Sequence, residues 1–190
     1  ISVTTGLSDD LARSVYRGLL DVAIVSEPTK LPTGMSWHPY ASESLVVIAN
    51  NKCKGEDAVE VLQSNPYIRF ERSSWVGELI NTKLKDLGIK VKTVVETDNF
   101  DSIWEMVSCG LGVAVVPQQG INTKTDQRLD YHHGKQNPHD KQKPRNIRMM
   151  ELGKSPIKLI SGLVERSANP KAHLVAALYE SLKNRDTISK

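Results

Sequence analysis

The stretch Val107-Ser108-Cys109-Gly110-Leu111-Gly112-Val113-Ala114-Val115-Val116-Pro117 decides the fold of this chain. Apolar residues at helical spacing lead up to Gly110, which stands where a helix ends. The run Val113–Val116 then has the uninterrupted apolar character of a strand buried on both faces, and Pro117 ends it. Because the glycines follow a helix and precede a strand, they do not form a dinucleotide-binding loop, which needs the opposite order.

The same unit occurs 92 positions earlier in the chain. The aligned pairs are Thr5 with Thr97, Leu11 with Ile103, Val15 with Val107, Gly18 with Gly110 and Leu19 with Leu111. After a slip of one residue, the apolar run 22–25 aligns with 113–116. Two units of one plan can agree through composition alone, but the agreement at apolar, glycine and threonine positions together favours two related lobes.

Strands and helices alternate along the rest of the chain. We expect strands at residues 1–4, 21–25, 45–48, 67–70, 91–96, 113–116 and 157–164. Helices are expected to begin at Ser8, near Glu56, at Ser73 or Ser74, at Asp98 or Asn99, and at Pro170. This alternation predicts an α/β fold with parallel, doubly wound sheets. In the second copy of the repeat a strand and a helix come first, whereas nothing precedes Ile1, so we expect a fragment cut within a fold.

The composition excludes several classes of protein. Of the 190 residues, 39% are apolar and 25% are charged, which supports a packed core. A net charge of +3 does not by itself indicate nucleic-acid binding. The longest apolar runs are too short for a transmembrane helix. Cys53 and Cys109 lack a CxxC partner, which argues against a zinc ribbon or a disulfide scaffold and fits a reducing compartment.

The stretch from Asn122 to Asn146 is hydrophilic and has no usable periodicity. Basic residues outnumber acidic ones in it, and two prolines interrupt it, which is typical of a solvated loop. Its histidines, His132, His133 and His139, lack the spacing of metal ligands, so we expect no metal site.

Hydroxyl side chains stand where predicted strands run into helices. They are Ser26, Ser73, Ser74 and Thr97. Ligands of open α/β sheets bind outside the carboxyl ends of the strands, where helix N-termini suit an anion or a carboxylate. For any one hydroxyl, helix capping is the simpler role. For the set, we expect a ligand cleft with Trp75 at its rim.

A catalytic role has less support. Cys53 lies between two lysines that would lower its pKa, but no ordered histidine can be named as its partner. Cys109 ends an amphipathic helix, where we expect it to pack. No convergent acid, base or nucleophile is found, so we expect no enzyme activity.

Together these segments resemble the effector-binding domain of LysR-type transcriptional regulators. The matching stretches are residues 18–25, 43–48, 65–68 and, best of all, 107–117, which is similar to the family's glycine-rich segment ending in proline. Their order and spacing match over about residues 1–120.

The resemblance implies a two-lobed fold like that of type 2 periplasmic binding proteins. Lobe one would hold residues 1–44 and 164–190, and lobe two residues 45–163. Two crossing strands, at 45–49 and 157–164, would join them. A small-molecule inducer would bind in the cleft without a cofactor. In the family this cleft is lined by residues that match Ser26, Ser73, Ser74, Thr97 and Asp98, with Pro117 and Gln118 close by.

The resemblance also implies partners. DNA would be bound by an N-terminal winged helix-turn-helix that this chain lacks, and the family's dimer leads us to expect a homodimer or higher homo-oligomer in the cytoplasm. The alternative is an extracytoplasmic solute-binding protein of the same fold, which an export signal upstream would reveal. An enzyme built on this fold is the third interpretation.

Overall fold

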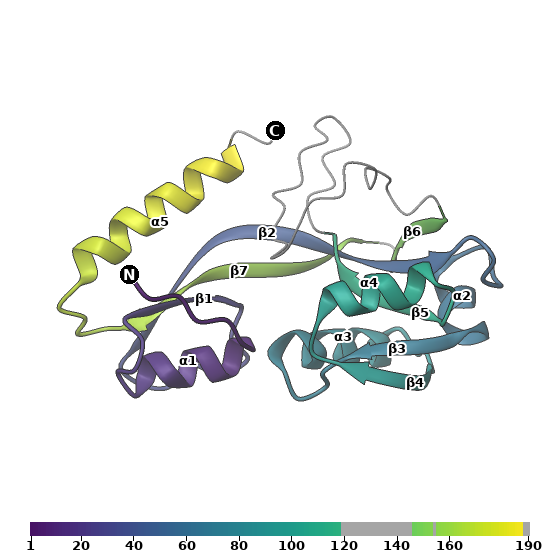
Figure 1. Cartoon of the computed structure of the whole chain (residues 1–190), viewed down its shortest axis with the longest axis horizontal. Coiled ribbons are helices and arrows are strands. Elements are labelled where there is room, and N and C mark those ends of the chain that lie inside the picture. The colour runs from purple at the N-terminus through teal and green to yellow at the C-terminus, as the bar shows by residue number, and fades with distance from the viewer. Residues whose placement is uncertain (119–145, 154, 188–190) are drawn as a thin grey trace, which may run out of the picture.

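Two long strands organise the molecule. The computed structural model describes residues 1–118, 146–153 and 155–187. Strands β2 (Met35–Asn50) and β7 (Ile157–Arg166) pair antiparallel, from Met35 opposite Arg166 to Leu45 opposite Ile157. They run side by side along the long axis, with α1, β1 and α5 at one end and α2, α3 and α4 at the other (Figure 1).

The described strands form one hydrogen-bonded sheet in the order β1-β7-β2-β5-β3-β4, with β6 also paired to β2. The shorter strands are β1 (Val22–Ser26), β3 (Pro66–Phe70), β4 (Lys92–Thr97), β5 (Val113–Pro117) and β6 (Ile147–Glu151). Among the described strands, the β3–β4 and β3–β5 pairs are parallel and the other pairs are antiparallel. The predicted α/β class is confirmed, but a parallel sheet throughout is wrong, because apolar runs report burial and not strand direction.

The predicted repeat is confirmed in the local structure. Helix α4 (Phe100–Ser108) begins and ends 92 positions after α1 (Ser8–Tyr16), and β5 lies 91 positions after β1. Both helices end in the same way, at Gly18 and Gly110, with φ of 77° and 78°. Such left-handed angles are readily adopted by glycine, which lacks a Cβ.

The predicted strands differ from the structure in three places. Residues 1–4 form no strand, and Ile1 and Val3 are exposed, because the described residues place no strand beside them for pairing. The strand expected at 45–48 is the last part of β2, which begins at Met35. Proline is unusual inside a strand, so Pro39 argued against a strand in this region, but it is tolerated because the pairing register shifts there. Strand β6 is absent from the expected set, since it directly follows the hydrophilic stretch.

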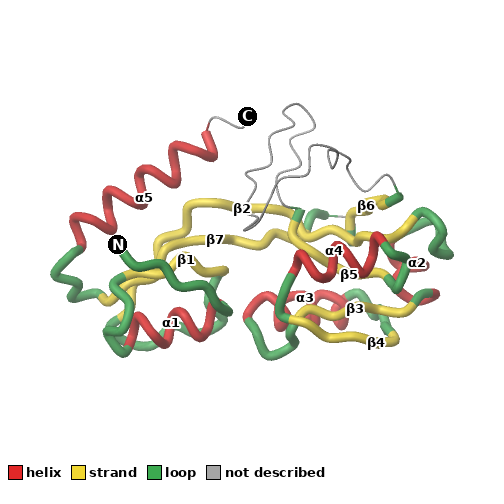
Figure 2. The backbone as a smooth tube through the Cα atoms, in the orientation of Figure 1, coloured by secondary structure: helices red, strands yellow, loops and turns green. Residues whose placement is uncertain are grey.

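The other helices are α2 (Ala58–Ser64), α3 (Trp75–Asp86) and α5 (Ala172–Thr187) (Figure 2). Asp57 begins α2, and its carboxylate accepts hydrogen bonds from the N–H groups of Val59 and Glu60, at 2.8 and 2.9 Å. No described helix is both long and apolar enough to cross a membrane.

The core has two clusters. The larger packs α2, α3 and α4 against β3, β5 and the second half of β2, and the runs 45–49 and 113–116 are buried throughout. The smaller joins Val15 of α1 to β1, Met35 and Val164. Trp75, the first residue of α3, packs against this smaller cluster although most of its helix belongs to the larger one. The start of α3 therefore lies where the two clusters meet.

Candidate functional site

A cavity of about 440 Å³ lies where three helices begin. Its lining comes from the starts of α1, α3 and α4 and from the end of β3: residues 5–8, Phe70, residues 74–76 and residues 98–100. We call it the three-helix pocket. The helices have 9, 12 and 9 residues, so each brings first-turn N–H groups and the positive end of its dipole to the same space.

Ser74 sets the start of α3. Its hydroxyl donates to the carbonyl of Glu71 at 2.7 Å and accepts from the N–H of Gly77 at 3.1 Å. The side chain is buried, and its one proton is already used, so Ser74 can offer a ligand only a lone pair. The N–H groups of Trp75 and Val76, which have no acceptor within the helix, are the stronger donors here.

The start of α4 is fixed by Asn99 and Phe100. The Asn99 side chain accepts from the N–H of Ser102 at 2.9 Å. Phe100 stacks on Phe70 at the end of β3, with ring centroids 4.0 Å apart and an angle of 4° between the rings. A stacked pair of this kind adds about 1 kcal/mol beyond the area it buries. Asp98 is exposed beside Asn99 and adds one negative charge to the lining.

The start of α1 differs from the other two. Leu7, not the expected Ser8, occupies the capping position, and no side chain bonds the first turn there. The Ser8 hydroxyl accepts instead from the N–H and the hydroxyl of Ser26, at 3.1 and 2.9 Å. The first-turn N–H groups of α1 are therefore left without a capping side chain beside the pocket.

Of the seven site residues expected from the sequence, Ser74 and Asp98 line the three-helix pocket. Ser26 reaches it only through Ser8. The Ser73 hydroxyl donates to the Glu71 carboxylate at 2.7 Å, and Thr97 accepts a 3.4 Å bond from the N–H of Asn99. Of the remaining two, Pro117 ends β5 and Gln118 follows it, with the Gln118 N–H donating to the Ser44 carbonyl at 2.7 Å. Their roles stay predictions.

Sequence reasoning missed residues 5–8, Phe70, Val76, Asn99 and Phe100 as lining residues. The repeat held a signal for the first of these, since Thr5 aligns with Thr97. Trp75, which was expected at the rim of a cleft, is among the residues that line this pocket.

Outside the pocket, Cys53 and Cys109 are free thiols. The expectation that Cys109 packs is wrong: it is exposed, because it lies one residue beyond α4 at the C-cap. The described residues hold no group of three or more potential metal ligands. His132, His133 and His139 lie outside the described residues, as does most of the stretch 122–146.

Next to the pocket, Arg72 and Glu96 form a hydrogen-bonded ion pair. The guanidinium donates to both carboxylate oxygens, and the Arg72 backbone N–H donates to Oε1 at 3.0 Å. These bonds lower the pKa of Glu96 to about 2. Because this pKa lies below that of a free carboxyl, the pair stabilises the folded state at neutral pH. The stabilisation is lost as the pH falls from about 4.5 toward 2.

Replacing Arg72 by glutamine is expected to raise the pKa of Glu96 from about 2 toward the ordinary value of 4.5, because the guanidinium bonds and charge are removed. The return is partial, since the backbone N–H at position 72 still donates to Oε1. Carboxyl chemical shifts followed by NMR between pH 2 and 7 measure this directly. A titration midpoint for Glu96 that stays near 2 in Arg72→Gln contradicts the assignment.

A mixed sheet whose flanking helices point their N-termini into one cavity is an arrangement that binds small molecules. The family model for the LysR substrate binding domain matches residues 1–139, and the chain belongs to this family. Members of this family are ligand-binding domains and not enzymes.

Curated relatives agree with this assignment. The chain is 28% identical over 122 residues to the HTH-type transcriptional regulator CzcR of Bacillus cereus, covering 64% of this chain and 41% of the relative. CzcR of Bacillus subtilis (strain 168) is 26% identical over 121 residues, with the same coverage. The chain thus spans about two fifths of the length of the relatives it matches.

Solved structures share the fold. The reduced form of the OxyR regulatory domain from Pseudomonas aeruginosa matches with a TM-score of 0.68 and 18% identity, covering 94% of this chain and 79% of that one. The regulatory domain of HypT from Salmonella typhimurium gives 0.71 and 14%, with 97% and 82% covered. The effector binding domain of QuiR in complex with shikimate gives 0.68 and 14%, with 95% and 78% covered.

Proposed function

We propose that this chain is the effector-sensing domain of a DNA-binding transcriptional regulator and that its effector binds in the three-helix pocket. The observation that carries the proposal is the convergence of α1, α3 and α4 on one cavity of about 440 Å³. That volume falls within the range of about 300–1,000 Å³ typical of small-molecule sites.

The pocket is assigned to the boundary between two lobes. Residues 5–8 enter it from the α1 side, and residues 74–76 and 98–100 enter it from the side of the larger cluster. The antiparallel pair β2–β7 passes between the two clusters and takes the role of the crossing strands. Lobe one then comprises residues 1–44 and 164–190, and lobe two residues 45–163. Binding at such a boundary lets a ligand change the relative position of the lobes.

The ligand class proposed is a small carboxylate. The uncapped first turn of α1 and the free N–H groups of Trp75 and Val76 suit an anionic oxygen. Asp98, the acidic lining residue, suits a hydroxyl or amine donor on the same ligand. An acid that also carries such a donor fits better than a bare inorganic anion. The shikimate held by the QuiR effector binding domain is an acid of this kind.

The remaining partners follow from the proposed role. The relatives are named HTH-type regulators, so DNA is bound by a helix-turn-helix region outside the matched part, and the protein works in the cytoplasm where the DNA lies. A homodimer is supported by β4, which ends the strand path and exposes Val94 and Val95 at 50% and 37%.

Titration calorimetry with shikimate, succinate and benzoate tests the site. Asn99→Asp keeps a good helix cap but adds a negative charge to the pocket, so carboxylate affinity should fall about tenfold. Asp98→Asn removes a charge at the neighbouring position and should raise the affinity by about the same factor. Opposite effects from adjacent substitutions are difficult to explain by altered folding.

Asn51→Asp is the matched control for charge, because Asn51 is exposed and outside the pocket. It should change the carboxylate affinity by no more than about twofold, since the charge of an exposed group outside the pocket is screened by solvent and salt. No binding of any of the three acids, or equal affinities for the Asp98 and Asn99 variants, contradicts a carboxylate site here.

A further inference from the structure

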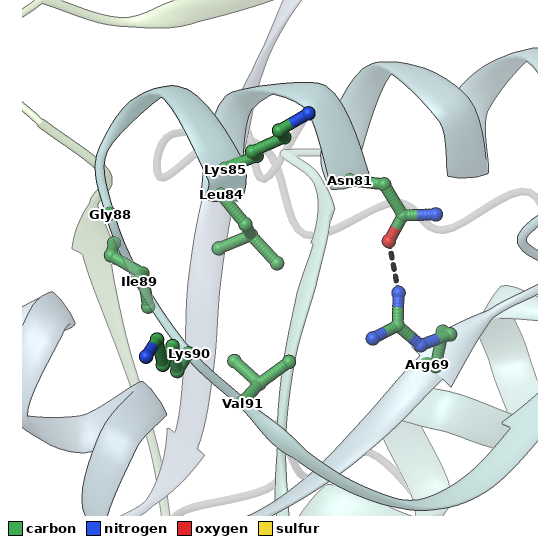
Figure 3. A pocket seen from close by; sticks show the side chains of 8 residues that line it. All are labelled: Arg69, Asn81, Leu84, Lys85, Gly88, Ile89, Lys90 and Val91. Carbon is green, nitrogen blue, oxygen red and sulfur yellow. Dashed lines mark hydrogen bonds between the residues drawn. The ribbon is translucent and has the colours of Figure 1, made fainter.

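A second cavity, of about 400 Å³, lies at the opposite end of α3 (Figure 3). It is lined by the second half of α3, by residues 88–91 and by Arg69 of β3. Its eight lining residues include three cations, Arg69, Lys85 and Lys90, and no acid. We call it the Arg69 pocket. The length of α3, at 1.5 Å per residue, separates it from the three-helix pocket by roughly 15 Å.

Arg69 is held in place by neutral groups. It lies half-buried on β3, with its guanidinium 5.4 Å from the centre of the Tyr67 ring. Nε donates to the Thr93 hydroxyl at 3.0 Å, and Nη1 donates to the Asn81 side-chain oxygen (Figure 3). These contacts orient the guanidinium toward the cavity without neutralising its charge.

The neighbouring carboxylate is already engaged. Glu96 is the residue opposite Arg69 in the β3–β4 pairing, but its two oxygens accept from Arg72. Within the described residues, no carboxylate lies within 4.0 Å of the Arg69 guanidinium. A partly buried guanidinium with unused N–H donors is costly unless an anion joins it.

The ammonium groups of Lys85 and Lys90 are not needed as donors to the C-terminal end of α3. The last carbonyls of α3 already accept hydrogen bonds from backbone N–H groups. The N–H groups of Leu87, Gly88 and Ile89 donate to the carbonyls of Lys83, Lys85 and Leu84, respectively, at 2.9–3.1 Å. Both lysines are exposed on opposite sides of the cavity, and neither forms an ion pair within the described residues (Figure 3). Their four-carbon stems allow the ammonium groups to turn inward.

Three residues of the lining are apolar. They are Leu84, Ile89 and Val91, and Asn81 and Gly88 complete the lining (Figure 3). A ligand that fits this lining carries a compact, strongly charged head for Arg69 and an organic part for the apolar wall.

We propose that the Arg69 pocket binds a phosphomonoester, with its phosphate on the Arg69 guanidinium and its organic group on Leu84, Ile89 and Val91. Three cations suit a phosphate dianion better than a carboxylate, and the planar guanidinium matches the geometry of phosphate oxygens. The chain would then take a second ligand, of a different class from the acid in the three-helix pocket.

The test is an NMR titration of the 190-residue chain with phenyl phosphate. We expect saturable shifts of the backbone amides of Gly88, Ile89 and Lys90. The double variant Lys85→Gln/Lys90→Gln should bind about tenfold more weakly, and Arg69→Met should lose binding, because a charge-assisted contact is removed. The lysines are exposed, so the double variant tests the site even where Arg69→Met impairs folding.

The matched control is Lys83→Gln/Lys92→Gln, which removes the same charge from residues outside the lining. It should bind within about twofold of the parent chain, and benzoate, with the same ring, should bind at least fivefold more weakly than phenyl phosphate. Equal weakening by the two double variants overturns the proposal, as does benzoate of equal affinity. Shifts confined to Trp75, Val76 and Phe100 assign the probe to the other pocket and also overturn it.

Discussion

Gly77→Ala is expected to destabilise the chain by at least about 3 kcal/mol, at the upper end of the cost of overpacking. A Cβ at this position would lie 1.9 Å from the carbonyl oxygen of Glu71 and 2.8 Å from its carbon. Both are backbone atoms, and the same carbonyl accepts the Ser74 hydroxyl, so the turn before α3 cannot yield without losing the helix cap. The start of α3 would move away from β3 and open the three-helix pocket.

Helix propensity makes the opposite prediction, because alanine in place of a helical glycine stabilises by up to about 1 kcal/mol. The sign of the change therefore distinguishes the two effects. Urea unfolding followed by tryptophan fluorescence measures it, with Thr82→Ala as the control on the exposed side of the same helix. Thr82→Ala should change stability by no more than about 0.5 kcal/mol. An unchanged or raised midpoint for Gly77→Ala contradicts the close approach.

Ile103→Ala is expected to cost about 3 kcal/mol, within the range for removing a large side chain from a core. Ile103 is fully buried on α4 within the larger cluster. Its partner in the repeat, Leu11 on α1, is half-buried against the smaller cluster, so Leu11→Ala should cost about half as much.

The two variants form a matched pair, because they remove similar side chains at equivalent positions of two similar helices. Differential scanning calorimetry provides the comparison, provided that one cooperative transition is seen for each variant. Equal losses of stability in the two variants would contradict the different burial of Ile103 and Leu11.

Local patterns predicted the parts of the fold that depend on neighbouring residues. The stops at Gly18 and Gly110 and the caps at Ser74 and Asn99 are confirmed, because each depends on a few residues in a row. Strand direction in β1 was wrong, since it is determined by β7 far along the chain.

The candidate site shows the same division. Ser74 and Asp98 were found because they stand at the starts of predicted helices. Ser26 is not among the lining residues of this pocket, and its hydroxyl donates to Ser8, a contact between segments that no local pattern reveals. Residues 5–7 were missed because they belong to no helix or strand, and Ser8, the first residue of α1, was expected only as a helix cap.

The pairing of β1 with β7 also determines the order in which the molecule is completed. Most residues of the larger cluster lie within 45–116, so they are synthesised before β7 and can pack among themselves. Val22–Ser26 is synthesised before any of these residues, yet its strand partner begins only at Ile157. Closing so long a loop is slow, and β1 is therefore among the last of the described strands to be paired. During that interval the backbone groups of β1 that later pair with β7 are unpaired, and such an edge is open to pairing with a wrong strand.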